Sequence, residues 1–156
     1  MRTLVALVGA VALFGAFAVA EDPVSSSCNF SDDNQVTIQY NPVVKDSPRN
    51  GKVWSTGATL YVQTPLTLAG TTLPLGAYSL YFIPDKKTWT IIVNKNVTAG
   101  AAYDSAQDLA RAQMQLGELP APQKELQLTF GHMAPKVCNL RVNFQKTGAF
   151  TDFLEK

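Results

Sequence analysis

Histidine and cysteine are scarce in this chain of 156 residues, and their scarcity excludes several kinds of site. The single histidine, His132, cannot supply a multi-histidine metal centre, and two cysteines are too few for a structural zinc site. The sequence also lacks a GxSxG nucleophile elbow, an SxxK motif, an HExxH motif and a glycine-rich phosphate loop. We therefore expect no bound metal and no cofactor.

Charged residues are also few, at 16% of the chain, and neither sign predominates among 13 basic and 12 acidic residues. Removal of residues 1–20 would take away Arg2 and no acidic residue, which would leave the two signs balanced. No basic run approaches the footprint of a nucleic-acid-binding surface. The composition therefore argues against a nucleic-acid partner and predicts a surface covered largely by neutral polar side chains.

The only long apolar run lies at the N-terminus. Arg2 precedes an uncharged apolar stretch over 4–17, and the small-x-small sequence AVA at 18–20 stands directly before Glu21. This order predicts a secretory signal peptide over 1–20 rather than a membrane anchor, which would need about 20 apolar residues. We expect an exported protein, periplasmic or secreted, with no membrane span after cleavage. A flexible tail over 21–34 and a single β domain over 35–156 would follow.

The two cysteines form an even pair. In an oxidising compartment such a pair is expected to form a disulfide, here between Cys28 and Cys138. The bridge would close a loop of over a hundred residues and tie the N-terminal tail to a late strand.

Apolar residues recur at every second position through most of the chain after residue 35. The segments 36–40, 58–63, 126–130 and 137–144 each place apolar residues on one face and polar residues on the other. One buried and one solvated face is typical of antiparallel sheets packed on a single side. The sequence predicts an all-β fold, an antiparallel β-sandwich of jelly-roll or barrel-like form.

The pattern over 73–95 predicts a hairpin of this sheet. Tyr78, Leu80 and Phe82 share one face of its first strand, and Pro84-Asp85 supplies a turn because proline presets φ. Trp89 alternates in step with apolar residues on the second strand, so we expect it in the core.

The segment 103–116 carries conflicting signals. Ser105 and Asp108 have the spacing of a capping box, whereas residues 110–116 alternate at the strand period. We expect one short helical turn over 104–108 and a strand over 109–116; a longer helix laid over one sheet is the alternative.

Candidate functional residues are mostly aromatic. Trp54, Tyr61, Tyr81, Trp89 and Tyr103 are candidates for a platform that stacks on a sugar or peptide, although the core is the favoured place for Trp89. Tyr61 and Tyr81 fall on the polar faces of their strands and are expected to point to solvent, whereas Trp54 suits either a core or a pocket wall. His132 shares the parity of Leu128 and Phe130, which predicts a structural histidine at the core rim rather than a general base.

Four blocks of the sequence resemble a known family. VWSTGAT at 53–59, LPLGAYSLYFIP at 73–84, WTIIVNK at 89–95 and the series Tyr103, Asp108 and Arg111 are similar to the bacterial domain of unknown function 2911. The resemblance covers about 36–144 and implies an exported, mostly β domain. It implies no activity.

The chain departs from the pattern of that family at two motif positions. Members usually carry WRTGAN, whereas Ser55 and Thr59 stand here in place of the arginine and the asparagine. The approach to the motif between Tyr40 and Trp54 is also shorter than in the family. If the family binds an anion through that arginine, this chain lacks its fork of donors, and Arg111 becomes the strongest polar candidate. A structural pair with Asp108 is the alternative explanation for Arg111.

These observations favour a non-catalytic exported β-sandwich that binds a small ligand or an envelope protein. The alternative is a small hydrolase that uses His132 or converging carboxylates. The candidate binding residues are Trp54, Thr56, Tyr61, Tyr81, Tyr103, Asp108, Arg111 and His132.

Overall fold

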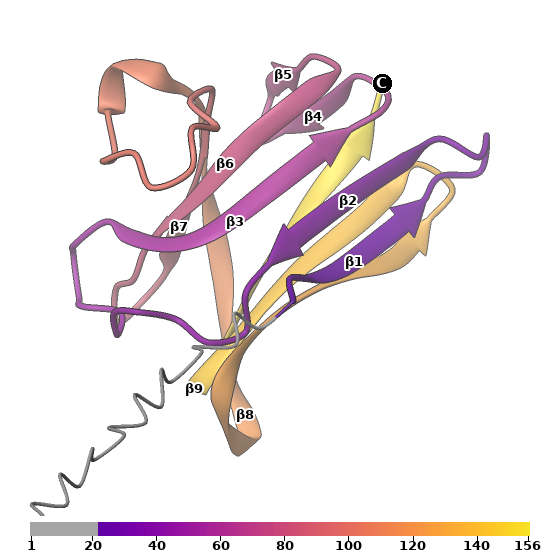
Figure 1. Ribbon diagram of the computed structural model, residues 1–156. Helices are drawn as coiled ribbons and strands as arrows, with labels where there is room; N and C mark the ends of the chain where they lie inside the picture. Colours follow the sequence, from indigo (N-terminus) through magenta and orange to yellow (C-terminus); the bar gives the residue numbers. More distant parts are fainter. Residues whose placement is uncertain (1–21) are drawn as a thin grey trace, which may run out of the picture.

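The computed structural model describes residues 22–156, so the predicted signal peptide over 1–20 lies outside the described residues. The described part is built from antiparallel strands and one turn of 3-10 helix, which confirms the predicted all-β class (Figure 1). The elements are β1 (Val24–Asn29), β2 (Gln35–Tyr40), β3 (Trp54–Val62), β4 (Leu66–Leu68), β5 (Thr71–Leu73), β6 (Gly76–Ile83), β7 (Trp89–Asn94), η1 (Ser105–Gln107), β8 (Asp108–Ala134) and β9 (Val137–Glu155).

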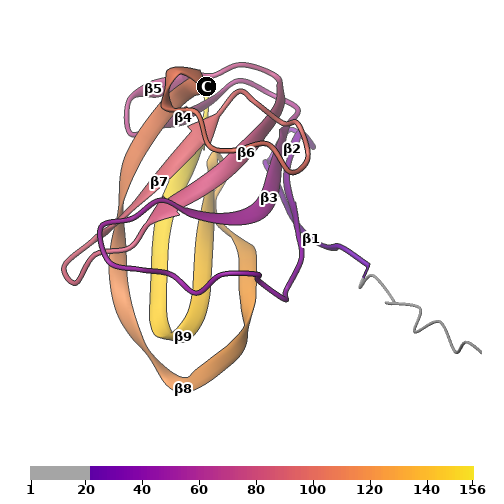
Figure 2. The same ribbon diagram turned by 60° about the vertical axis from the view of Figure 1, so that its left-hand side comes forward.

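The strands form two layers that share β8. One layer has the order β1-β2-β3-β6-β7-β8, and the other continues from β8 through β9 and β4 to β5. The first part of β8 pairs with β7 as far as Met114, and the strand then pairs with β9 from Gln115 onward. Figure 2 shows β8 curving around β9. The order begins at β1 and ends at β5, so the fold is a sandwich of barrel-like curvature without closure.

Two prolines mark the place where β8 bends. Its pairing with β9 is irregular between Glu118 and Gln127, and Pro120 and Pro122 lie in this interval. Proline has no N–H to donate to the ladder, so strand pairing is interrupted there and resumes after the bend.

The core lies between the two layers, where the alternating apolar residues meet. Trp89 is buried as predicted, and its ring meets Trp54 edge to face at 6.0 Å. The predicted core faces of β2, β3 and β6 are all buried, which confirms the period-two interpretation. These buried residues are Val36, Ile38, Tyr40, Ala58, Leu60, Val62, Tyr78, Leu80 and Phe82.

The disulfide predicted between Cys28 and Cys138 is present. It joins β1 to β9 with a Cα–Cα distance of 6.1 Å, across a sequence separation of 110. Nearby, the backbone N–H of Phe130 in β8 donates a 2.9 Å hydrogen bond to Ser26 Oγ in β1. The edge of the first layer is thus fastened to the second layer by side chains.

The expectation of a flexible tail over 21–34 is wrong for most of that segment. Residues 24–29 form β1, which pairs with β2 from Val24↔Tyr40 to Asn29↔Gln35. The polar composition of the segment suggested disorder. An edge strand, however, is held by backbone hydrogen bonds and needs few buried side chains. In β1 the buried side chain is that of Cys28. The turn after β1 is also ordered, since Asp32 Oδ1 accepts a hydrogen bond from the N–H of Asn34.

The contested segment follows the mixed prediction of a helical turn and a strand, but the cap is Asp104 and not Ser105 of the predicted capping box. One 3-10 turn over Ser105–Gln107 begins at Asp104, whose side chain accepts a hydrogen bond from the N–H of Ala106. A strand follows, but it runs from Asp108 to Ala134 and is much longer than the predicted 109–116. No helix in the described part of the chain is long and apolar enough to cross a bilayer.

Candidate functional site

The outer face of the first layer carries a small buried cluster of its own. Strand register places Ser55, Tyr81, Ile92 and Arg111 in one row across β3, β6, β7 and β8. Tyr81 and Ile92 belong to this outer face, because their neighbours along each strand point into the core. Both are nevertheless buried, with 7% and 0% of their surface exposed.

A covering segment explains this burial. The chain between β7 and β8, residues 95–107, folds back over the outer face (Figure 1). Its Tyr103 ring packs against the Tyr81 ring at a centroid distance of 4.9 Å, and Ser79 Oγ donates a 2.8 Å hydrogen bond to Asn96 O. The expectation that Tyr81 points to solvent is therefore wrong, since periodicity gives the face of a strand and not what covers it.

A hydrogen-bond network centred on Asp108 fastens the covering segment. Tyr103 Oη donates to Asp108 Oδ2 at 2.7 Å, and Asn94 Nδ2 donates to Asp108 Oδ1 at 2.8 Å. Arg111 Nη2 lies 2.7 Å from the same Oδ2 in an ion pair and also donates to Tyr103 Oη at 2.7 Å. Asn94 donates a further bond to the backbone oxygen of Asp104. The structure thus brings Tyr81, Tyr103, Asp108 and Arg111 together.

Titration behaviour in the network follows from these contacts. Burial alone would raise the pKa of Asp108, but hydrogen bonds from Tyr103, Asn94 and Arg111 and the charge of Arg111 outweigh it and lower the pKa. Burial and the hydrogen bond to Asp108 raise the pKa of Tyr103, and burial raises the pKa of Tyr81. At neutral pH the network holds an ionised carboxylate, a guanidinium and neutral phenols. The donors and acceptors of the network are paired with one another, so the network holds the covering segment to the sheet.

A pocket of about 400 Å³ lies beside this cluster, over β3 and β6. Its walls come from the segment 41–46, from residues 55–59 of β3, from residues 79–81 of β6 and from the segment 97–101. Strand β3 carries a bulge between Ser55 and Ala58, where Gly57 has a φ of 68°. Glycine adopts this left-handed conformation without strain, and the residues of the bulge belong to the pocket lining.

Neutral hydrogen-bonding groups dominate the pocket lining. Lys45 and Asp46 are its only charged residues, and their charges oppose each other. Val43 and Val97 are 53% and 47% exposed and add apolar surface. The polar lining residues are Asn41, Ser55, Thr56, Thr59, Ser79 and Thr98.

Thr56 and Trp54 have distinct places around the pocket. Thr56 is 7% exposed, and its Oγ1 is buried with no hydrogen-bond partner in the described part of the chain. Such an atom is uncommon in folded proteins. Trp54 is a core residue, but its Nε1 donates a 2.8 Å hydrogen bond to Asp46 O and so holds the 41–46 wall in place.

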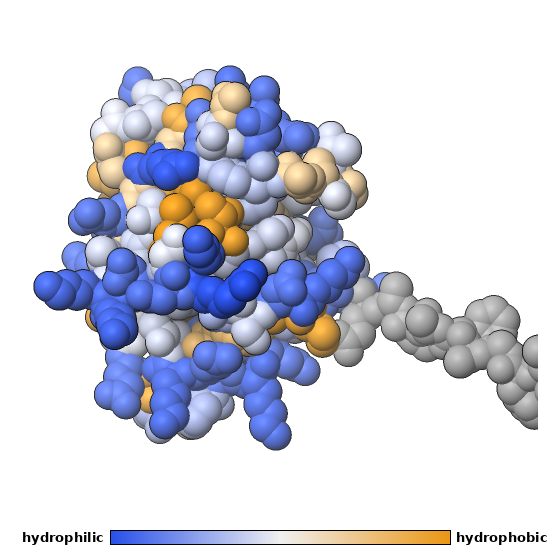
Figure 3. Space-filling view, turned by 90° about the vertical axis from the view of Figure 1, so that its left-hand side faces the viewer, coloured by the Kyte–Doolittle hydropathy of each residue, from blue (hydrophilic) through white to orange (hydrophobic). Residues whose placement is uncertain are grey.

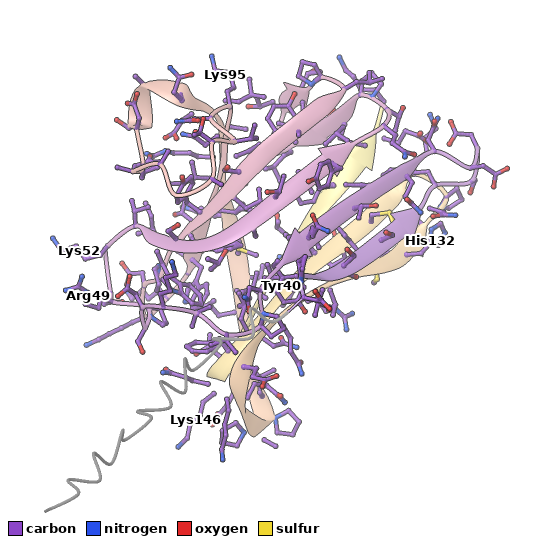
Figure 4. All side chains as sticks on the ribbon, in the orientation of Figure 1. Tyr40, Arg49, Lys52, Lys95, His132 and Lys146 are labelled. Carbon is purple, nitrogen blue, oxygen red and sulfur yellow. A yellow bond between two sulfur atoms is a disulfide. The ribbon has the colours of Figure 1, made fainter. Side chains whose placement is uncertain are left out.

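The remaining predicted residues lie away from the pocket. Tyr61 is 40% exposed, as expected from its polar face, and its hydroxyl lies 3.5 Å from Gln39 Oε1. His132 lies in β8, near the end of β1 and the turn that leads to β2, as Figure 4 shows. It is exposed beyond buried Leu128 and half-buried Phe130, which fits the predicted rim position.

Most residues of the pocket wall were not among the binding residues predicted from the sequence. Ser79 and the segment 97–101 carry no motif, and Ser55 and Thr59 were noted only as departures from the family motif. Gly57 inside a strand pattern was a further signal, because such a glycine often marks a bulge. The surface on the side that lies left in Figure 1 is largely hydrophilic with small apolar patches, so hydropathy does not reveal the pocket either (Figure 3).

A comparison with protein-family models gives one match, to the protein family of unknown function DUF2911, over residues 25–152. The searches of curated proteins and of solved structures each gave no significant match. Because the family model spans most of the chain, the protein belongs to the DUF2911 family, as the sequence motifs predicted.

Proposed function

We propose that this DUF2911 family member is an exported, non-catalytic binding protein whose ligand occupies the pocket over β3 and β6. The observation that carries the proposal is the pocket itself, of about 400 Å³, with several hydroxyl-bearing residues and the amide of Asn41 in its lining. Sites for small molecules commonly enclose about 300–1,000 Å³ and combine apolar surface with a few placed polar groups.

The chemistry of the lining favours a neutral ligand rich in hydroxyl or amide groups, and we propose a saccharide. Hydroxyl side chains both donate and accept hydrogen bonds, as do sugar hydroxyls. Lys45 and Asp46 balance each other, so the lining offers no net charge for an ion. The exposed valines at the rim would pack against the apolar face of a sugar ring.

The two departures from the usual family motif support the same choice. Ser55 and Thr59 both line the pocket. An arginine at position 55 would offer a planar fork of charged donors suited to a carboxylate or phosphate, and serine offers only a small neutral hydroxyl. We infer that this member binds a neutral ligand.

Export is part of the proposal. The order of charge, apolar run and small-x-small sequence before Glu21 supports cleavage of a signal peptide. A disulfide between the only two cysteines also suits a periplasmic or extracellular protein.

The alternative of a hydrolase has no specific observation in its favour. His132 Nδ1 lies 2.8 Å from the backbone oxygen of Asn29, and no serine or acid side chain hydrogen-bonds its ring in residues 22–156. Asp108 is engaged by Tyr103, Asn94 and Arg111. The Nδ1 atom of His132 and the carboxylate of Asp108 are therefore engaged in contacts that hold the fold together.

Titration calorimetry of the mature protein against neutral mono- and oligosaccharides, anionic sugars and short peptides tests the proposal. Thr56→Val keeps the shape of the side chain and removes its hydroxyl, so we expect roughly tenfold weaker binding if a rotated Thr56 donates to the ligand. The free variant should be as stable as the parent or slightly more stable, because an unpartnered buried hydroxyl is lost.

Thr90→Val is the matched control, since Thr90 is half-buried in β7 and does not line the pocket. It should bind like the parent protein. Binding confined to anionic sugars or peptides would overturn the ligand class, and equal affinities for the two variants would remove Thr56 from the site.

A further inference from the structure

One histidine and two cysteines meet at one place, away from the pocket. His132 is the only histidine of the chain, and Cys28 and Cys138 are its only cysteines. Their sulfur atoms and a ring nitrogen of His132 lie within 4.8 Å of one another. Figure 4 shows His132 and the disulfide at the same end of the molecule.

Three different strands fix this arrangement. Cys28 comes from β1, and His132 of β8 and Cys138 of β9 are direct partners in the antiparallel register. Side chains of such partners stand on the same side of a sheet, with Cβ atoms about 5 Å apart. Both cysteines are buried, whereas His132 is exposed, so His132 is the member of the cluster that solvent reaches.

The hydrogen bond of His132 sets which nitrogen is free. Nδ1 lies 2.8 Å from Asn29 O, and a backbone carbonyl can only accept, so Nδ1 carries the proton of the neutral ring. Nε2 then keeps its lone pair. A histidine that binds a metal through one nitrogen usually donates its other N–H to an oxygen in this way.

We propose that reduction of the Cys28–Cys138 disulfide converts this cluster into a Zn²⁺ site. A dithiol reductant supplies two electrons and two protons, so the S–S bond breaks, two thiols form and the reductant becomes a disulfide. On binding Zn²⁺ each thiol releases its proton to solvent. The two thiolates and Nε2 of His132 are the protein ligands, and water takes the fourth position on the exposed side.

The two cysteines need only small movements to hold Zn²⁺ between their sulfurs. Zn–S distances of about 2.3 Å in a tetrahedral site place two sulfurs roughly 3.8 Å apart. Rotation of the two cysteine side chains supplies this separation, and the strands hold the Cα atoms 6.1 Å apart. The disulfide and the zinc site exclude each other, which makes the cluster a redox-dependent metal site. This inference is independent of the proposed ligand pocket.

The test uses the mature protein, reduced and kept without oxygen, and titrated with Zn²⁺ in competition with a chromogenic chelator. We expect one Zn²⁺ per reduced chain and none at this site in the oxidised protein. His132→Ala should bind at least roughly tenfold more weakly, and the Cys28→Ser/Cys138→Ser variant should not bind. Equal affinity of reduced parent and His132→Ala, or no more binding by reduced parent than by the double serine variant, would overturn the proposal.

Two further readouts cover the case in which the reduced chain unfolds. Zn²⁺ should then restore the β circular dichroism of the reduced parent, and failure to do so counts against the site. In redox titrations of the disulfide, Zn²⁺ should raise the midpoint by about 30 mV for each tenfold excess over its Kd. His132→Ala keeps the disulfide and should show a smaller rise; an unchanged midpoint in the parent contradicts the inference.

Discussion

At the scale of single residues, the outer face shows how much one carboxylate can organise. Asp108 accepts hydrogen bonds from Tyr103, Asn94 and Arg111, and these partners belong to the covering segment and to two strands. Arg111 is 47% exposed at its side chain, so the ion pair itself contributes little, and the less exposed hydrogen bonds carry more of the stabilisation.

Asp108→Asn is therefore expected to lower the free energy of unfolding by about 1–2 kcal/mol near neutral pH. The folded pKa of Asp108 is below its ordinary value of 3.8, so its ionised form stabilises the fold above that pH. The stabilisation disappears as the pH falls through the folded pKa. Urea denaturation of parent and variant at several pH values should show their difference shrinking in acid.

Asp33→Asn serves as the control for this experiment. Asp33 is exposed in a turn at a φ of 68°, a conformation that asparagine also tolerates. The free energy of unfolding of Asp33→Asn should stay within about 0.5 kcal/mol of that of the parent protein. A pH-independent difference between the parent protein and Asp108→Asn would show that the charge of Asp108 is not the cause.

The residue scale also shows what periodicity can and cannot predict. Trp89 and Leu60 alternate with polar neighbours and are buried, because the face of a strand follows directly from its two-residue period. Tyr81 obeys the same rule and still lacks exposure, because Tyr103, 22 positions later, packs over it. No local pattern contains that contact.

At the scale of elements, the weakest predictions concern strands with polar sequence. β1 contains three serines and was expected to be a tail, yet it pairs along its whole length with β2. β8 was expected to end near Leu116, but its bend at the prolines allows the same strand to continue into the second layer. Pairing and bending of this kind depend on partners that lie far away in the sequence.

The disulfide between β1 and β9 provides a test of how the N-terminal strand is held. Replacement of both cysteines by serine should lower the free energy of unfolding by about 3–4 kcal/mol, because a bridge over a separation of 110 residues restricts the unfolded chain. Urea denaturation under non-reducing conditions measures the loss. Each single Cys→Ser variant should lose nearly as much as the double variant, since either one removes the bridge. A loss below about 1 kcal/mol would mean that the ladder between β1 and β2 suffices to hold the N-terminal strand.

At the scale of the whole molecule, the fold class and the family were within reach of the sequence, and the pocket was not. Short motifs and the two-residue period are local features. The pocket is assembled from four separate stretches, including the segments 41–46 and 97–101, whose meeting depends on the complete strand order. The buried Thr56 hydroxyl could be recognised only after that assembly.

Export is the prediction that concerns the whole chain. Expression of the full-length protein in a bacterial host should yield a periplasmic or extracellular form that begins near Glu21. N-terminal sequencing and intact mass spectrometry of the fractionated cells provide the measurement. A chain that retains residues 1–20 in the membrane fraction would identify the segment as an anchor instead.

We propose that the pocket over β3 and β6 is the ligand site. Its most direct test is a ¹H–¹⁵N NMR titration of the mature protein with the neutral saccharide that gives the largest calorimetric heat. We expect the amide shifts of Gly57, Thr59, Ser79 and Gly100 to change most and those around His132 to stay unchanged. Shift changes confined to other surfaces, with these four amides unmoved at saturation, would contradict it.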